Sequence, residues 1–214
     1  MRASLFARVA RAPAASARGF AARPAVVLTT DHFAALGLPR TFEVDPSALR
    51  ADYLRLMAEH HPDRHTLASD ADQADSADRS AALTRAFSVV SAPHRRAVHL
   101  LELLGAPLME ETNGTALLGR EFLSEVMDAR FDVEDSDTTV ERLKELRVEN
   151  SQAMEAMHAE LRAAFARVAA SGRGSEDGTA ALEAAKELTA KLGYLKKIDD
   201  VADDRLELEE ERGG

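Results

Sequence analysis

The chain contains no cysteine and no tryptophan, and aromatic residues make up only 5% of its 214 residues. Without cysteine it can form no disulfide, no zinc knuckle and no cysteine-ligated metal cluster of its own. It also lacks any run of about 18 apolar residues, the length that a membrane-spanning helix needs, so no membrane partner is expected. Alanine, leucine, glutamate and arginine are abundant instead, and this mixture favours helices. We therefore expect an all-α fold.

Residues 1–30 contain no acidic residue and no lysine but five arginines, with many Ala and Ser residues. An Arg-rich, acid-poor leader is typical of an organelle transit peptide, which takes no part in the fold. The segment Arg18-Gly19-Phe20-Ala21 resembles a matrix-processing site that is cut after Phe20. We therefore expect 1–30 to be a mitochondrial transit peptide that directs the chain to the matrix. A chloroplast address and a disordered basic arm that binds nucleic acid are the alternatives.

Acidic residues outnumber basic ones in the rest of the chain. Removing the five arginines of 1–30 from the 27 basic residues leaves 22, against 37 acidic residues, so the formal charge is −15. A protein that binds nucleic acid neutralises phosphates with a basic surface. We therefore expect no nucleic acid among the partners of the mature chain.

A helix is predicted immediately before the tripeptide His61-Pro62-Asp63. Asp45 can cap it by accepting a bond from a free backbone N–H, and Pro46 suits the first helical position. An apolar stripe at steps of three and four follows: Leu49, Tyr53, Leu56 and Met57. Pro62 stops the helix and pushes His61 out of the α region. The tripeptide is therefore expected on an exposed loop.

This arrangement resembles the J domain of DnaJ-type co-chaperones, in which an HPD tripeptide joins the second and third helices. Tyr53 lies eight residues before His61 and Arg50 lies eleven before it, at positions typical of that family. A short opening helix within 31–39 and a further helix over 81–90 complete the pattern. The resemblance implies that the loop binds a heat-shock-70-class chaperone and stimulates its ATPase. The implied chaperone-binding residues are His61, Pro62, Asp63, Arg50, Tyr53, Arg55 and Arg64.

Metal binding by His60, His61 and His65 is the competing interpretation of this loop. Pro62 breaks the helix that would place two of these side chains on one face, and the chain has neither cysteine nor an HExxH pattern. The segment 66–80, rich in Ala, Ser and Asp, is expected to be a solvated loop. It lacks the glycine and the terminal glutamate of a calcium-binding EF-hand. We therefore expect no metal site and no cofactor.

The second half of the chain is predicted to form an antiparallel three-helix bundle. Its helices are expected over 117–131, from Thr138 or Thr139 onward, and after a turn at 171–178. The core stripe expected on the last helix consists of Leu182, Ala185, Leu188, Leu192 and Leu195. The expected organisation is therefore a J domain built on a helical hairpin (31–105), a linker (106–115), the bundle (116–208) and a disordered tail (209–214).

Two segments of this bundle, together with 93–105, resemble the HscB-type branch of J proteins. Residues 121–130 are similar to its "FLMExLExR" signature and 191–198 to its "KLRFLDKL" segment. The resemblance covers about 31–208. It implies a co-chaperone that binds the iron–sulfur cluster scaffold protein and delivers it to a DnaK-type chaperone, promoting cluster assembly and transfer. The implied scaffold-binding residues are Leu123, Met127, Asp128 and Tyr194.

Three points keep alternatives open. Ser124 and Phe131 depart from the HscB-type pattern, in which a methionine and an acid are common. On an ideal helix Tyr194 falls about 100° from Leu195, so it either belongs to a partner-binding patch or packs at the margin of the core. A general mitochondrial J-domain co-chaperone for protein folding or import is the alternative function. No nucleophile–base pair or phosphate loop is evident, so we do not expect an enzyme.

Overall fold

The computed structural model describes residues 30–60, 70–108 and 115–213. The chain divides into two compact units, the first ending at Gly105 and the second beginning at Ala106. All regular secondary structure in these residues is α-helical, and none of their helices is both long and apolar enough to span a membrane. Each unit has its own buried core.

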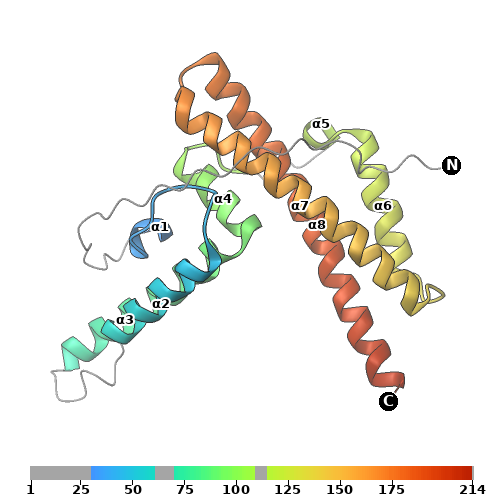
Figure 1. Ribbon diagram of the computed structural model, residues 1–214, viewed down its shortest axis with the longest axis horizontal. Coiled ribbons are helices and arrows are strands. Elements are labelled where there is room, and N and C mark those ends of the chain that lie inside the picture. Colours follow the sequence, from blue (N-terminus) through green and yellow to red (C-terminus); the bar gives the residue numbers. More distant parts are fainter. Residues whose placement is uncertain (1–29, 61–69, 109–114, 214) are drawn as a thin grey trace. The chain divides into compact units, whose positions relative to one another are not determined.

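The described residues of the first unit form the helices α1 (His32–Ala35), α2 (Pro46–His60), α3 (Asp70–Ser91) and α4 (Pro93–Leu103). Figure 1 shows α2 and α3 side by side, and α1 packs against α3. The core of this unit is apolar and is built mainly from Phe33, Leu36, Phe42, Leu49, Leu83, Val90, Leu100 and Leu101. The helical hairpin expected from the sequence is therefore present.

The predicted cap of α2 is confirmed. The Oδ1 atom of Asp45 accepts hydrogen bonds from the backbone N–H of Ser47 at 2.8 Å and of Ala48 at 3.3 Å. Leu49 and Leu56 of the predicted stripe are buried. The sequence rule for helix starts therefore holds here.

The predicted loop at 66–80 is wrong for residues 70–80, because α3 begins at Asp70. The hydroxyls of Ser76 and Ser80 both donate to the backbone carbonyl of His60, at 2.6 and 2.9 Å. These bonds supply side-chain donors to the carbonyl of the last residue of α2. A tertiary contact therefore favours helix in a segment whose composition alone indicated a loop.

The second unit contains α5 (Thr115–Leu118), α6 (Arg120–Glu134), α7 (Val140–Ser171) and α8 (Glu176–Gly213). The helices α7 and α8 form a long antiparallel hairpin, and α6 packs against one part of it (Figure 1). The predicted three-helix bundle is confirmed. Two boundaries differ: Gly119, with φ of 76°, separates α5 from α6, and α8 is helical to Gly213 where a disordered tail was expected.

Specific polar contacts fix the ends of these helices. The hydroxyl of Thr139 accepts a hydrogen bond from Arg142 N–H at 3.2 Å, so Thr139 caps α7, close to the start expected at Thr138 or Thr139. From α8, Arg205 Nη1 donates to the carbonyl oxygens of Val133 (2.9 Å) and Asp135 (3.1 Å) at the end of α6. A cation at a helix C-terminus satisfies free carbonyls and complements the helix dipole.

The core stripe of α8 differs in part from the prediction. Ala185, Leu192 and Leu195 are buried as expected, but Leu182 and Leu188 are only half-buried. Ala181 and Thr189 are buried, both less than 2% exposed. Small residues at these positions let the α7 backbone approach α8 closely. Which face of α8 packs against α7 depends on this close approach. In the first turn of α8, a Cβ added to Gly178 would lie 1.8 Å from the carbonyl oxygen of Gly172, in the turn that precedes the helix.

Candidate partner-binding site

A groove of about 430 Å³ lies on the second unit, between α6 and α8. Its lining is mostly apolar and consists of Leu123, Val126, Met127, Arg130, Val133, Tyr194, Lys197, Ile198, Asp200 and Val201. The α6 residues among them recur at steps of three and four, and so do those of α8. Each helix therefore presents one face to the groove.

The structure brings together three of the four residues predicted to bind a scaffold protein. Leu123 and Met127 line the groove from α6, and Tyr194 lines it from α8. Asp128 is exposed on α6 and does not belong to the lining. Met127 is 71% exposed, whereas Leu123 and Tyr194 are half-buried and pack on the core of the bundle. Met127 is thus the residue of this group most available to a partner.

Tyr194 packs at the margin of the core and also lines the groove. Its ring meets the ring of Phe122 edge-on, with centroids 6.5 Å apart, so one side of it packs against the core. Lys197 Nζ lies 5.5 Å from the centroid of the Tyr194 ring, and both residues line the groove. A fixed aromatic ring beside a cation is a common anchor at protein interfaces.

The charged groups around the groove are mostly paired. Arg130 Nε bonds Glu134 at 2.6 Å, and Asp200 pairs with Lys196. On α6, burial raises the pKa of Glu125, and the nearby carboxylates of Glu121 and Asp128 raise it further. The exposed side of α6 therefore carries closely spaced acids, unlike the groove itself.

The predicted chaperone-binding residues are only partly described. His61, Pro62, Asp63 and Arg64 lie outside the described residues. On α2, Tyr53 stacks on Phe87 of α3, with ring centroids 4.4 Å apart, which helps to join the two helices.

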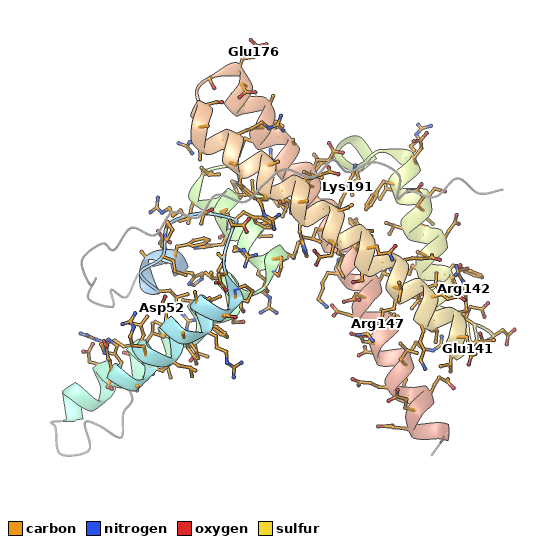
Figure 2. All side chains as sticks on the ribbon, viewed as in Figure 1. Asp52, Glu141, Arg142, Arg147, Glu176 and Lys191 are labelled. Carbon is orange, nitrogen blue, oxygen red and sulfur yellow. The ribbon has the colours of Figure 1, made fainter. Side chains whose placement is uncertain are left out.

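The arginines of α2 differ in their surroundings. Arg55 donates a hydrogen bond to Asp52 at 3.0 Å and lies 3.5 Å from Glu59, and its bond to Asp52 is the main cause that raises the pKa of Arg55. Asp52 projects from α2 in Figure 2. Arg50 is exposed. The carboxylates around Arg55 reduce the positive field of this helix.

Comparison with known proteins shows the family to which the chain belongs. Residues 119–203 match the family model described as the HSCB C-terminal oligomerisation domain. A co-chaperone protein HscB homolog from Azoarcus sp. is 32% identical over 185 residues, which are 86% of this chain and 97% of that protein. The chain belongs to the HscB co-chaperone family. The mitochondrial J-type co-chaperone jac1 of Schizosaccharomyces pombe is 36% identical over 110 residues, 51% of this chain and 46% of that protein.

Solved structures show the same HscB fold. The crystal structure of human co-chaperone protein HscB has a TM-score of 0.70 at 23% identity, and the match covers 86% of this chain and 84% of the human one. The chaperone HscB from Vibrio cholerae has a TM-score of 0.67 at 23% identity, covering 84% and 99%. The first unit is therefore a J domain and the second is an HscB C-terminal helical bundle.

Sequence reasoning missed several residues of the groove in this HscB-family chain. Arg130, Lys197, Ile198 and Val201 line it but were not predicted as site residues. Ile198 lies four residues after Tyr194, and Val201 follows three residues later, so their spacing carried the signal. The sequence could not show which face of α8 meets α6, and this pairing is what places them in the groove.

Proposed function

We propose that this chain is a co-chaperone that binds the iron–sulfur cluster scaffold protein through the groove between α6 and α8. It delivers the scaffold to a DnaK-type, heat-shock-70-class chaperone and so promotes cluster assembly and transfer. The observation that carries this proposal is that Leu123 and Met127 of α6 line one groove together with Tyr194 of α8, which is distant from them in sequence.

The chemistry of the groove suits a protein partner. Met127 offers exposed apolar surface, while Leu123 and Tyr194 are already held in place by the core beneath them. Side chains fixed before binding lose little conformational entropy when the partner arrives. An apolar centre with charged groups at its margin is the usual composition of a protein–protein interface.

Stimulation of the chaperone is assigned to the tripeptide His61-Pro62-Asp63 and to the neighbouring residues of α2. Arg50 is exposed on that helix, whereas Arg55 forms salt bridges with Asp52 and Glu59. Because these carboxylates offset the charge of Arg55, the electrostatic attraction of α2 to an acidic chaperone surface is modest. ATP hydrolysis takes place in the chaperone, and the proposed role of this chain is to accelerate it. No group of three or more His, Asp or Glu side chains in the described residues could hold a metal ion.

The proposal is tested by calorimetric titration of the full chain with purified iron–sulfur scaffold protein. Met127→Ala should weaken binding by ~10-fold or more without changing the melting temperature, because truncation of an exposed anchor removes a contact with the partner but none with the core. The matched control is Val148→Ala on α7, a residue that is 57% exposed and outside the groove. A scaffold that binds Met127→Ala as tightly as the wild type would contradict the proposed site.

A general J-domain co-chaperone for protein folding or import is the alternative. It would stimulate the same class of chaperone but would not retain the scaffold in a pull-down. We also propose a mitochondrial matrix location, supported by the Arg-rich composition of 1–30 and by the mitochondrial relative in Schizosaccharomyces pombe. The N-terminal sequence of the matrix protein should then begin near Ala21, and a protein that retains Met1 would contradict this address.

A further inference from the structure

Two serine hydroxyls of α3 bond the same backbone atom of α2. Ser76, which is 5% exposed, donates to the carbonyl oxygen of His60 at 2.6 Å, and the half-buried Ser80 donates to it at 2.9 Å. His60 is the last residue of α2 and is followed in the chain by the tripeptide His61-Pro62-Asp63. The two serines therefore hold the backbone at the point where the chain leaves α2. We call Ser76 and Ser80 the α3 anchor.

These bonds differ from the usual bonds of a hydroxyl within a helix. The side chain of a helical serine or threonine commonly donates to the carbonyl four residues earlier in its own helix. Thr84 of α3 does so, since its Oγ1 donates to the carbonyl oxygen of Ser80 at 2.9 Å. Ser76 and Ser80 instead donate to a carbonyl of α2, sixteen and twenty residues earlier in the chain. The hydroxyls of the α3 anchor therefore join two helices.

The end of α2 lacks one of the donors that commonly close a helix. The last four carbonyls of a helix have no donor within it, and backbone N–H groups just beyond the helix supply some of the missing bonds. Pro62, two residues after the last residue of α2, has no N–H to donate. A carbonyl oxygen has two lone pairs, so that of His60 can accept from both serines at once. The α3 anchor thus supplies side-chain donors where the sequence removes a backbone donor.

A second contact fixes α2 against α3 two helical turns before His60. The ring of Tyr53 stacks on that of Phe87, and the Tyr53 hydroxyl oxygen lies 3.4 Å from Thr84 Oγ1. Thr84 and Phe87 follow the α3 anchor at steps of four and three residues, so all four residues share one face of α3. The two helices lie side by side in Figure 1. Contacts at Tyr53 and at His60 therefore define one register between them.

We infer that Ser76 and Ser80 are positioning residues for stimulation of the chaperone's ATPase, and that they act through the carbonyl of His60. They fix the place and direction from which the chain enters the tripeptide, so that the Asp63 carboxylate meets the chaperone in one arrangement. This inference rests on the proposed function, because that function assigns stimulation to the tripeptide.

The α3 anchor is expected to affect stimulation more than affinity. Attraction to the chaperone comes from exposed charge on α2, such as that of Arg50, which does not depend on the anchor. The effect of a bound chain on the reaction rate depends steeply on the geometry of the acting group. A chain without the anchor should therefore still bind the chaperone but accelerate its ATPase less.

The test measures the steady-state ATPase of a purified DnaK-type chaperone against increasing concentrations of the full chain. Ser76→Ala and Ser80→Ala combined should lower the maximal stimulation several-fold, since two neutral hydrogen bonds are together worth ~10-fold or more in the equilibrium that holds His60. The concentration that gives half-maximal stimulation should stay that of the wild type. Alanine favours helix more than serine does, so the variant should keep the helicity of α3, which circular dichroism checks.

A matched pair of variants separates the hydroxyl from the bulk of the side chain. Threonine and valine have the same shape and similar helix propensity, but only threonine carries a hydroxyl. Ser80→Thr should keep most of the maximal stimulation, whereas Ser80→Val should lose as much as Ser80→Ala. The control is Ser88→Ala, which removes an exposed hydroxyl of α3 that accepts a bond from Arg95 and should match the wild type.

Three results would overturn the inference. The first is wild-type maximal stimulation by the combined variant. The second is a raised half-maximal concentration with an unchanged maximum, because a variant that only lowers the folded fraction needs more protein but reaches the same maximum. The third is an equal loss in Ser80→Thr and Ser80→Val.

Failure of the proposed function gives a different result. If the wild-type chain does not stimulate the chaperone, or if Asp63→Asn stimulates it as well as the wild type does, the assignment to the tripeptide is wrong and the inference falls with it. If the wild type stimulates and Asp63→Asn does not, the proposed function stands. The serine variants then decide the role of the α3 anchor alone.

Discussion

The side-chain amide of Asn150 on α7 donates a hydrogen bond to the backbone carbonyl of Leu195 on α8, with 3.0 Å between Nδ2 and O. Both residues are buried. Leu195 directly follows Tyr194, so the bond fixes α7 against the part of α8 that lines the groove. A buried polar bond of this kind favours one register of two apolar helices over its neighbours.

We predict that Asn150→Ala lowers the free energy of unfolding by about 1–3 kcal/mol, because it removes a buried hydrogen bond and leaves a small cavity. Asn150→Leu, which fills the space, should be less destabilising. Urea unfolding followed by circular dichroism measures both. Equal stability of Asn150→Ala and the wild type would show that the bond contributes nothing net.

The second prediction concerns the start of the J domain and its dependence on pH. Asp31 caps α1 by accepting bonds from Phe33 and Ala34 N–H, and Arg40 Nε bonds its other oxygen at 2.7 Å. Burial raises the pKa of Asp31, but the bonds from Ala34, Arg40 and Phe33 together outweigh burial and leave the pKa below its ordinary value. The folded state therefore favours the ionised carboxylate.

A depressed carboxylate pKa contributes stability above the pKa of the unfolded chain, and this contribution is lost as the pH falls through the folded pKa. Asp31→Ala should lower the free energy of unfolding by about 0.5–2 kcal/mol at pH 7, the range for loss of a helix cap. The difference from the wild type should shrink below about pH 4, near the ordinary pKa of aspartate. Urea unfolding of both proteins between pH 3 and 7 measures it, and a difference independent of pH would contradict the prediction.

The third prediction is that Asp63→Asn abolishes stimulation of the chaperone. A carboxylate can form a charge-assisted bond with an arginine of the partner, and such a bond is stronger than a neutral one. The variant should keep the helicity and melting temperature of the wild type. Steady-state ATPase assays of a heat-shock-70-class chaperone provide the measurement. Asp75→Asn on α3, where Asp75 pairs with Arg79 on the same helix, is the control and should retain stimulation.

The fourth prediction is that hydrogen peroxide oxidises Met127 before the other described methionines. Met57, Met154 and Met157 are half-buried, whereas Met127 is 71% exposed. The sulfur of Met127 takes one oxygen atom from the peroxide, which is released as water, and the apolar thioether becomes a polar sulfoxide. A time course followed by peptide mass spectrometry checks the order of oxidation.

Oxidation of Met127 should also weaken scaffold binding, since a sulfoxide presents a polar group where the groove offers apolar surface. Met127→Leu supplies the control, because leucine retains the apolar contact and has no sulfur. Peroxide should therefore reduce the affinity of the wild type and leave that of Met127→Leu unchanged. Equal losses in both proteins would assign the effect to another residue.

Local sequence rules predicted the starts of α2 and α7 but not those of α3 and α6. The caps Asp45 and Thr139 could be recognised because each accepts bonds from residues only two or three positions away. The start of α3 could not, because Ser76 and Ser80 act on a carbonyl that lies sixteen and twenty residues earlier. The break at Gly119 was also missed, although glycine is the residue that adopts its positive φ most readily.

Some residues of the candidate site could be predicted from the sequence, but the full lining of the groove could not. Resemblance to a family selected Leu123, Met127 and Tyr194, which the structure brings into one groove. The lining residues Lys197 and Val201 depend on the pairing of α6 with α8, which no local pattern encodes. The exposure of Phe131 was equally inaccessible, since an apolar residue on an amphipathic helix is expected to face the core.

The position of the groove along α8 determines how readily the backbone of that region unfolds locally. The groove residues from Tyr194 to Val201 lie where α8 is covered by both α6 and α7, and Arg205 adds a bond to α6 at the end of this region. Amide hydrogen exchange in this middle section should require unfolding of the whole bundle, whereas the two ends of α8 can fray locally. The backbone beneath the proposed docking groove is therefore expected to be the slowest part of α8 to exchange.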